Sequence, residues 1–239
     1  MRVDQLAAAV FSLPVGDDYR LHYLTGRHAA EWTQKVVPVE AAETVLESRR
    51  GSTGHGNNPW FAIGREGLTS EVHGPVWYGA LAWSGSFRIS VASDNLGRVR
   101  IAGGYNPYDF SWTLKPGETL DTPVFYAGYL GEGLGGASRT FHQFEVAHIL
   151  PHGTKARLRP VLYNSWEATA FDVTEAGQMA LAEKAAKIGV ERFVVDDGWF
   201  GARNSDKAGL GDWTVNPTKF PNGLKPLIDQ VKGLGMDFG

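Results

Sequence analysis

The feature that most constrains the fold is the run FVVDDGW at 193–199, in which two acidic residues follow an apolar segment. The apolar residues 193–195 suit a strand that is buried on both faces, as in a parallel sheet covered by helices. Asp196 and Asp197 would then follow its carboxyl end, where parallel α/β folds gather their ligand-binding groups. The structural alternative is an acidic tight turn, because Asp197-Gly198 is also an ordinary turn signal.

Two tryptophans favour the ligand-binding interpretation. Trp166 and Trp199 lie close to the carboxyl ends of two successive predicted strands, 160–163 and 192–195. A hexose offers hydroxyl groups that donate to carboxylates and a flat patch of C–H bonds that packs on an indole. The alternative for each indole is packing in the core or at its rim. Carboxylates and aromatic rings at one edge therefore predict a sugar site.

The second half of the chain has the periodicity of a parallel α/β fold. After the strand at 160–163, Thr174 is a plausible N-cap for a helix over 175–188 that Gly189 ends. The strand at 192–195 leads through a loop of about 25 residues, long enough to suggest a function. A second helix is expected from Pro221 and Asn222, and a third strand at 236–238. The order β-α-β-α-β predicts the start of a parallel sheet or barrel.

Residues 1 to about 158 have a different pattern, with short β-type runs separated by turn signals. Many short strands with turns predict an antiparallel sandwich. The segment 137–150 is expected to be a helix or a strand that links the sandwich to the following domain, which begins near residue 159. The expected strands are 60–63, 76–83, 86–91, 99–102, 110–114 and 123–129.

One glycine motif in this half raises the possibility of nucleotide binding. Gly131, Gly133 and Gly136 satisfy G-x-G-x-x-G between a predicted strand and a possible helix. However, no second strand ending in an acidic residue follows at the distance that a dinucleotide site requires. We therefore expect a flexible connector here rather than a phosphate site.

Composition excludes several classes of function. The formal net charge is -3 and the isoelectric point is about 6.2, which gives no basic surface for nucleic acid or for a membrane. No apolar stretch approaches the length of a membrane helix, and we do not expect residues 1–14 to be a signal peptide. The absence of cysteine excludes thiolate metal sites and is compatible with the cytoplasm. We expect no cofactor and no metal site.

The motifs of the second half resemble those of glycoside hydrolase family 36, the bacterial α-galactosidases. RPVLYNSWEA, FVVDDGWFG, LGDW, PNGL and GMDFG occur in the family's order, and ESRRGSTGHGNNP, WSG and GYNPYDFSWTLKPGE continue the resemblance upstream. The resemblance implies that 1–158 is part of an amino-terminal β-supersandwich. It also implies that 159–239 contains the first three strands of a catalytic (β/α)8 TIM barrel.

The same resemblance assigns roles to individual residues. It implies that Asp196 and Asp197 hold the C4 and C6 hydroxyl groups of galactose, and that Trp166 forms an aromatic wall of the sugar subsite. At 24–32, LTGRHAAEW looks like a family stretch that usually has Trp where this chain has His28. His28 is therefore either a contact to the substrate or a solvated loop histidine. Trp199 joins the candidate substrate-binding set through its position.

The resemblance further implies a retaining α-galactosidase that acts on galacto-oligosaccharides such as melibiose and raffinose. A retaining mechanism needs two carboxyl groups about 5–5.5 Å apart across the glycosidic bond. Both catalytic Asp residues are expected beyond Gly239, so this chain is expected to be an internal piece without activity of its own. The longer protein is expected to be a homo-oligomer. The alternatives are a galactosyl transferase of the raffinose-synthase kind and a galactoside-binding module without turnover.

Overall fold

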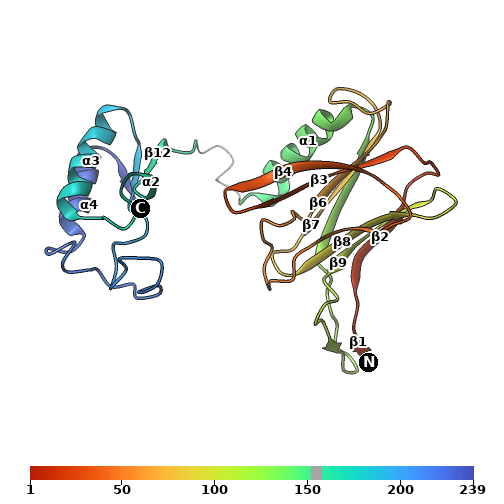
Figure 1. Cartoon of the computed structure of the whole chain (residues 1–239), viewed down its shortest axis with the longest axis horizontal. Helices are drawn as coiled ribbons and strands as arrows, with labels where there is room; N and C mark the ends of the chain where they lie inside the picture. The colour runs from red at the N-terminus through yellow and green to blue at the C-terminus, as the bar shows by residue number, and fades with distance from the viewer. Residues whose placement is uncertain (152–157) are drawn as a thin grey trace. The chain divides into compact units, whose positions relative to one another are not determined.

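The computed structural model describes residues 1–151 and 158–239 (Figure 1). The chain divides into two compact units, Met1–His152 and Gly153–Gly239. Within the described residues, the first unit is built from antiparallel sheets and one long helix, and the second unit from three parallel strands and three helices. The sequence places its change of periodicity near residue 159.

The first unit contains two larger antiparallel sheets. One has five strands in the order β11 (Val124–Leu130), β7 (Val76–Ala82), β6 (Trp60–Arg65), β3 (Tyr19–Arg27) and β4 (Ala30–Pro38). The other has four strands in the order β2 (Ala7–Ser12), β9 (Val99–Tyr105), β8 (Phe87–Ser93) and β5 (Thr44–Glu47). The short strands β1 (Arg2–Val3) and β10 (Trp112–Thr113) pair with each other.

The two larger sheets share one apolar core, as in a sandwich. Along β8, Phe87, Ile89 and Val91 are buried while the residues between them are partly exposed. This period of two is what a strand with one buried face requires. The core unites side chains of both sheets, among them Leu21, Phe61, Ile63, Leu81, Phe87, Ile89, Val91, Val99 and Ile101. The predicted antiparallel sandwich is therefore confirmed.

Helix α1 (Gly133–Phe144) covers the outer face of the five-stranded sheet, where it contacts β6, β7 and β11 (Figure 1). A π-helical turn, η1 (Glu145–Ile149), continues it. A second cluster packs Ala62, Val76 and Tyr78 of the sheet against Ala137 of the helix. Covering both faces explains why β6 is buried from Phe61 to Gly64 without alternation.

The expectation of a flexible connector at the glycine motif was wrong. Gly133 begins α1, and its backbone N–H donates to the carbonyl of Gly74 at 3.1 Å. The N–H groups of Leu134 and Gly135 donate to the carbonyls of Ser70 and Glu71 at 3.0 and 2.9 Å. The first three N–H groups of the helix thus donate to backbone carbonyls of the protein. These hydrogen bonds hold the helix start in place, and they leave no free N–H group for a phosphate at these three positions.

The second unit contains the parallel sheet β12 (Leu162–Asn164), β13 (Arg192–Val194) and β14 (Asp237–Phe238), in that order. The connections contain α2 (Trp166–Thr169), α3 (Glu175–Lys187) and α4 (Lys225–Gly233). Helices α3 and α4 lie side by side (Figure 1). Their buried residues Ala182, Leu227 and Val231 pack with Phe193 of β13 in one cluster. The predicted start of a parallel barrel is confirmed.

The starts of the two longer helices of this unit were both predicted from sequence, one correctly and one not. Thr174 caps α3 as predicted, its hydroxyl accepting a hydrogen bond from the N–H of Gly177 at 3.2 Å. In contrast, α4 begins at Lys225 rather than at Pro221, because residues 221–224 form a turn in which Gly223 has φ +72°. None of the helices in the described ranges has the length and apolar character that crossing a membrane requires.

Candidate functional site

Asp196 lies just past the end of β13 and has an open carboxylate. Its Oδ2 accepts a hydrogen bond from Nδ2 of Asn164 at 2.7 Å, and its Oδ1 accepts one from the N–H of Asp197 at 2.7 Å. Its own N–H donates to Oγ of the buried Ser165 at 2.9 Å. Among the described residues each carboxylate oxygen thus accepts one hydrogen bond. Because each oxygen has two lone pairs, Asp196 keeps acceptor capacity for a ligand.

Asn164 also binds the backbone of Trp166 and so links it to the Asp196 carboxylate. Oδ1 of Asn164 accepts the backbone N–H of Trp166 at 2.8 Å, so one side chain at the end of β12 contacts both groups. The tryptophan is 36% exposed, and one of its sides meets Phe171 edge-on at 5.0 Å between ring centroids. An indole fixed on one side and exposed on another can pack against an apolar ligand surface.

Asp197 points in a different direction and pairs with Arg203. The guanidinium Nε lies 2.9 and 3.0 Å from the two carboxylate oxygens, and Nη2 lies 2.8 Å from Oδ2. The side chains are only 22% and 8% exposed. The donated hydrogen bond from Arg203 holds the pKa of Asp197 below its ordinary value against the opposing effect of burial. Asp197 therefore carries a charge that the protein itself compensates.

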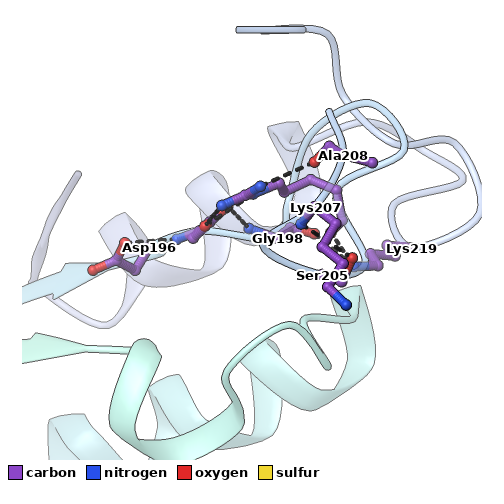
Figure 2. Close-up of polar contacts among 8 residues, drawn as sticks. Asp196, Gly198, Ser205, Lys207, Ala208 and Lys219 are labelled. Carbon is purple, nitrogen blue, oxygen red and sulfur yellow. Dashed lines mark hydrogen bonds and ion pairs between the residues drawn. The ribbon is translucent and has the colours of Figure 1, made fainter. Parts of the chain in front are cut away.

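Lys219 fastens the loop that carries this pair. Its ammonium group donates to the backbone carbonyls of Phe171, Gly198 and Arg203 at 2.8, 2.7 and 3.2 Å. Three acceptors satisfy the three N–H bonds of an ammonium group. Burial lowers the pKa of Lys219, although nearby carboxylates oppose the shift. Figure 2 shows Lys219 and Asp196 at opposite ends of this network.

The other two predicted residues lie elsewhere. Trp199 is separated from the acidic pair by Gly198, and its ring packs against the core of the second unit and meets Phe200 at 5.2 Å between ring centroids. His28 belongs to the first unit, in the turn between β3 and β4, where its side chain is 96% exposed and Nδ1 lies 3.9 Å from Oε1 of Glu31. The structure thus brings together Asp196, Asp197 and Trp166. In the described ranges no three His, Asp or Glu side chains are placed to hold a metal ion.

Comparison with known families accounts for the chain in two consecutive matches. The model for the glycosyl hydrolase family 36 N-terminal domain matches residues 1–115, and the model for melibiase matches residues 119–239. The chain belongs to the melibiases of glycosyl hydrolase family 36. The resemblance expected from the sequence motifs is therefore confirmed.

Individual relatives of this melibiase-family chain are named α-galactosidases. Alpha-galactosidase AgaA of Geobacillus stearothermophilus is 40% identical over 223 residues, which are 93% of this chain and 30% of the relative. Mel36A of Lactobacillus acidophilus is 39% identical over 225 residues, or 94% and 31% of the two chains. The crystal structure of AgaA superposes with a TM-score of 0.94, 37% identity, and coverage of 100% and 33%. The chain thus spans about a third of these relatives' length.

Sequence reasoning missed four residues of the candidate site. Asn164 and Ser165 could have been predicted, because they follow the end of a predicted strand as Asp196 does. Arg203 and Lys219 had no such signal, since they lie in the long segment between β13 and α4, which lacks periodicity. A buried ion pair in a loop depends on the path of the backbone, which residue spacing does not reveal.

Proposed function

We propose that this chain forms the galactose-binding part of a retaining α-galactosidase, which releases terminal non-reducing α-D-galactosyl residues from sugars such as melibiose and raffinose. One observation carries the proposal: the open carboxylate of Asp196 and the half-exposed indole of Trp166 lie at the ends of adjacent parallel strands, linked through Asn164. The names of the relatives support it. Variants of AgaA, 36% identical to this chain, have been crystallised with stachyose and with raffinose.

The carboxylates in this proposal select galactose by its hydroxyl groups. Asp196 accepts hydrogen bonds from the sugar with the lone pairs that Asn164 and the Asp197 N–H leave open. Asp197, whose oxygens already accept hydrogen bonds from Arg203 and from the N–H of Gly198, forms the second, fixed carboxylate beside the sugar. A hydroxyl of the wrong configuration at C4 would leave a carboxylate without its partner, which costs more than a missing apolar contact. The C–H face of the ring packs on Trp166.

The acidic pair binds rather than cleaves in this proposal. Asp196 and Asp197 are consecutive and diverge, one toward Asn164 and the other toward Arg203. Retaining hydrolysis needs one carboxyl group on each side of the glycosidic bond, about 5–5.5 Å apart. We therefore assign the nucleophile and the acid/base to later barrel strands, as the family resemblance implies. Trp199 supports the loop, and His28 enters the proposal only through the resemblance.

A homo-oligomer in the cytoplasm completes the proposal, again on the family resemblance and on the composition of the chain. Light scattering of a longer chain, continued past Gly239 to the length of the relatives, measures the oligomeric state directly. A monomeric mass would contradict this part of the proposal and leave the sugar site untouched.

Replacing Asp196 tests the site. In the longer chain we expect Asp196→Ala to lower kcat/KM for an aryl α-galactoside by at least about a hundredfold, because two charge-assisted hydrogen bonds are lost. The matched control is Asp229→Ala, whose carboxylate forms an exposed pair with Lys225 on α4. Equal activity of the Asp196→Ala variant and the control would contradict the proposed role of Asp196.

A further inference from the structure

Besides Asp197, the guanidinium of Arg203 contacts a backbone carbonyl and an aromatic ring. The guanidinium Nη1 donates to the carbonyl of Ala208 at 3.0 Å, which closes the loop around the side chain. The guanidinium carbon also lies 5.3 Å from the centroid of the Phe171 ring. The planar cation is thus held between a carboxylate and an aromatic ring.

Phe171 extends this contact to the other side of the candidate sugar site. Its ring packs edge-on against Trp166 at 5.0 Å, with an angle of 89° between the two planes. Its backbone carbonyl accepts a hydrogen bond from Lys219, which also binds the carbonyl of Arg203. One continuous set of contacts therefore runs from Asp197 through Arg203 and Phe171 to the indole.

The backbone at Gly198 packs closely against the backbone of Phe171, which belongs to this set of contacts. Gly198 has φ +96°, a conformation that other residues adopt only with strain, and a Cβ there would lie 3.1 Å from Cα of Phe171. The chain after β13 is thus pressed against the chain after α2, and Lys219 ties the two carbonyls together. The distance between the acidic residues and the aromatic wall is fixed by this arrangement.

We propose that Arg203 is a positioning residue for sugar recognition: it orients the carboxylate of Asp197 and, through Phe171, the indole of Trp166. This inference rests on the proposed function. Arg203 does not touch the sugar in this account. Its fork of N–H donors, together with the N–H of Gly198, fixes the direction of the Asp197 carboxylate, and its guanidinium lies over the Phe171 ring that packs against Trp166. The role requires the shape of a guanidinium and not only its charge.

Arg203→Lys separates shape from charge. Lysine keeps the positive charge beside Asp197 but loses the planar fork and the stacking face. In the longer chain we expect KM for an aryl α-galactoside to rise by about tenfold to a hundredfold, as for other misplaced binding groups. We expect kcat to change much less, and the preference for galactoside over glucoside to fall. The matched control is Arg192→Lys on β13, whose pair with Asp237 is more exposed.

A double-mutant cycle tests whether Arg203 acts through Asp197. We expect the effect of Arg203→Lys on KM to shrink by most of its size in an Asp197→Asn background, because both changes remove the same orientation. Thermal unfolding of every variant separates an effect on sugar binding from a general loss of folding. A lower Tm with an unchanged KM in the Arg203→Lys variant would show a purely structural role and overturn the inference.

Different results would overturn the proposed function and the positioning role of Arg203. If the unsubstituted longer chain has no preference for α-galactosides over α-glucosides, both the proposed function and the inference that rests on it are overturned. If that preference exists and survives Arg203→Lys unchanged, the proposed function stands and the positioning role of Arg203 is overturned.

Discussion

Neighbouring carboxylates at one strand end would ordinarily repel each other, and two side-chain contacts prevent this in the second unit. Successive residues of an extended segment point to opposite sides. Asp196 accordingly turns to Asn164, while Asp197 turns to Arg203. One acidic group is left open and the other is neutralised by a buried cation. This division gives two adjacent residues of the same type different chemical tasks.

The lowered pKa of Asp197 predicts an acid-sensitive contribution to stability. An unfolded Asp titrates near pH 3.9, and the folded group titrates below that value. The pair with Arg203 therefore contributes its full stability above about pH 4 and loses it as the pH falls through the lowered pKa. We expect Arg203→Met to lower the free energy of unfolding by about 3 kcal/mol at pH 7 and by less at pH 3. Urea unfolding of the 239-residue chain at both pH values measures this. An equal loss at pH 3 and pH 7 would contradict the assignment.

Some residues of the candidate site can be predicted from sequence periodicity and others cannot. Asp196 and Trp166 could be predicted, because a strand end is recognisable from apolar periodicity and its following residues belong to the rim. The partner of Asp197 could not, since Arg203 lies six residues away in a loop without periodicity. Lys219 lies 21 residues from Gly198, whose carbonyl it binds. Such contacts depend on how the loop folds back.

Among the elements, α1 differs most from what its sequence suggested. The motif glycines Gly131, Gly133 and Gly136 have the spacing of a phosphate-binding loop, yet two of them serve close packing. A Cβ on Gly133 would lie 2.5 Å from the carbonyl oxygen of Ser70, and one on Gly136 would lie 2.6 Å from Cβ of Glu132. Backbone does approach Gly133 closely, but the approaching group is the 70–74 turn, where the motif suggested a phosphate. A pattern of glycines alone cannot distinguish these two partners.

Alanine substitutions within this motif provide a matched comparison. Gly133 has φ +72° and contacts backbone atoms, so we expect Gly133→Ala to lower the free energy of unfolding by about 1–3 kcal/mol. Gly131 has open space around its Cβ position, so we expect Gly131→Ala to change it by at most about 0.5 kcal/mol. Urea unfolding followed by circular dichroism provides both values. Equal effects of the two substitutions would refute the packing role of Gly133.

At the scale of the whole molecule, two kinds of architecture share one chain, and each was predictable for a different reason. In the first unit, the closely spaced turn signals predicted the sandwich; strands β2 to β5 were not foreseen individually. In the second unit, alternating strand and helix periods predicted the parallel order of β12, β13 and β14. The family follows from matches that cover both units. The chain spans 30% of the length of alpha-galactosidase AgaA, so hydrolytic activity is proposed for a longer chain and not for these 239 residues.

The most direct test of the account is the ratio of kcat/KM for an aryl α-galactoside to that for the matching α-glucoside, measured on a chain continued past Gly239 to the length of the relatives. The account predicts a ratio of at least about a hundred, since a carboxylate left without its hydroxyl partner disfavours the C4 epimer. It also predicts no turnover by the 239-residue chain alone. A ratio near one, or hydrolysis by the 239-residue chain, would contradict the assignment of Asp196 and Asp197 as galactose-binding rather than catalytic groups.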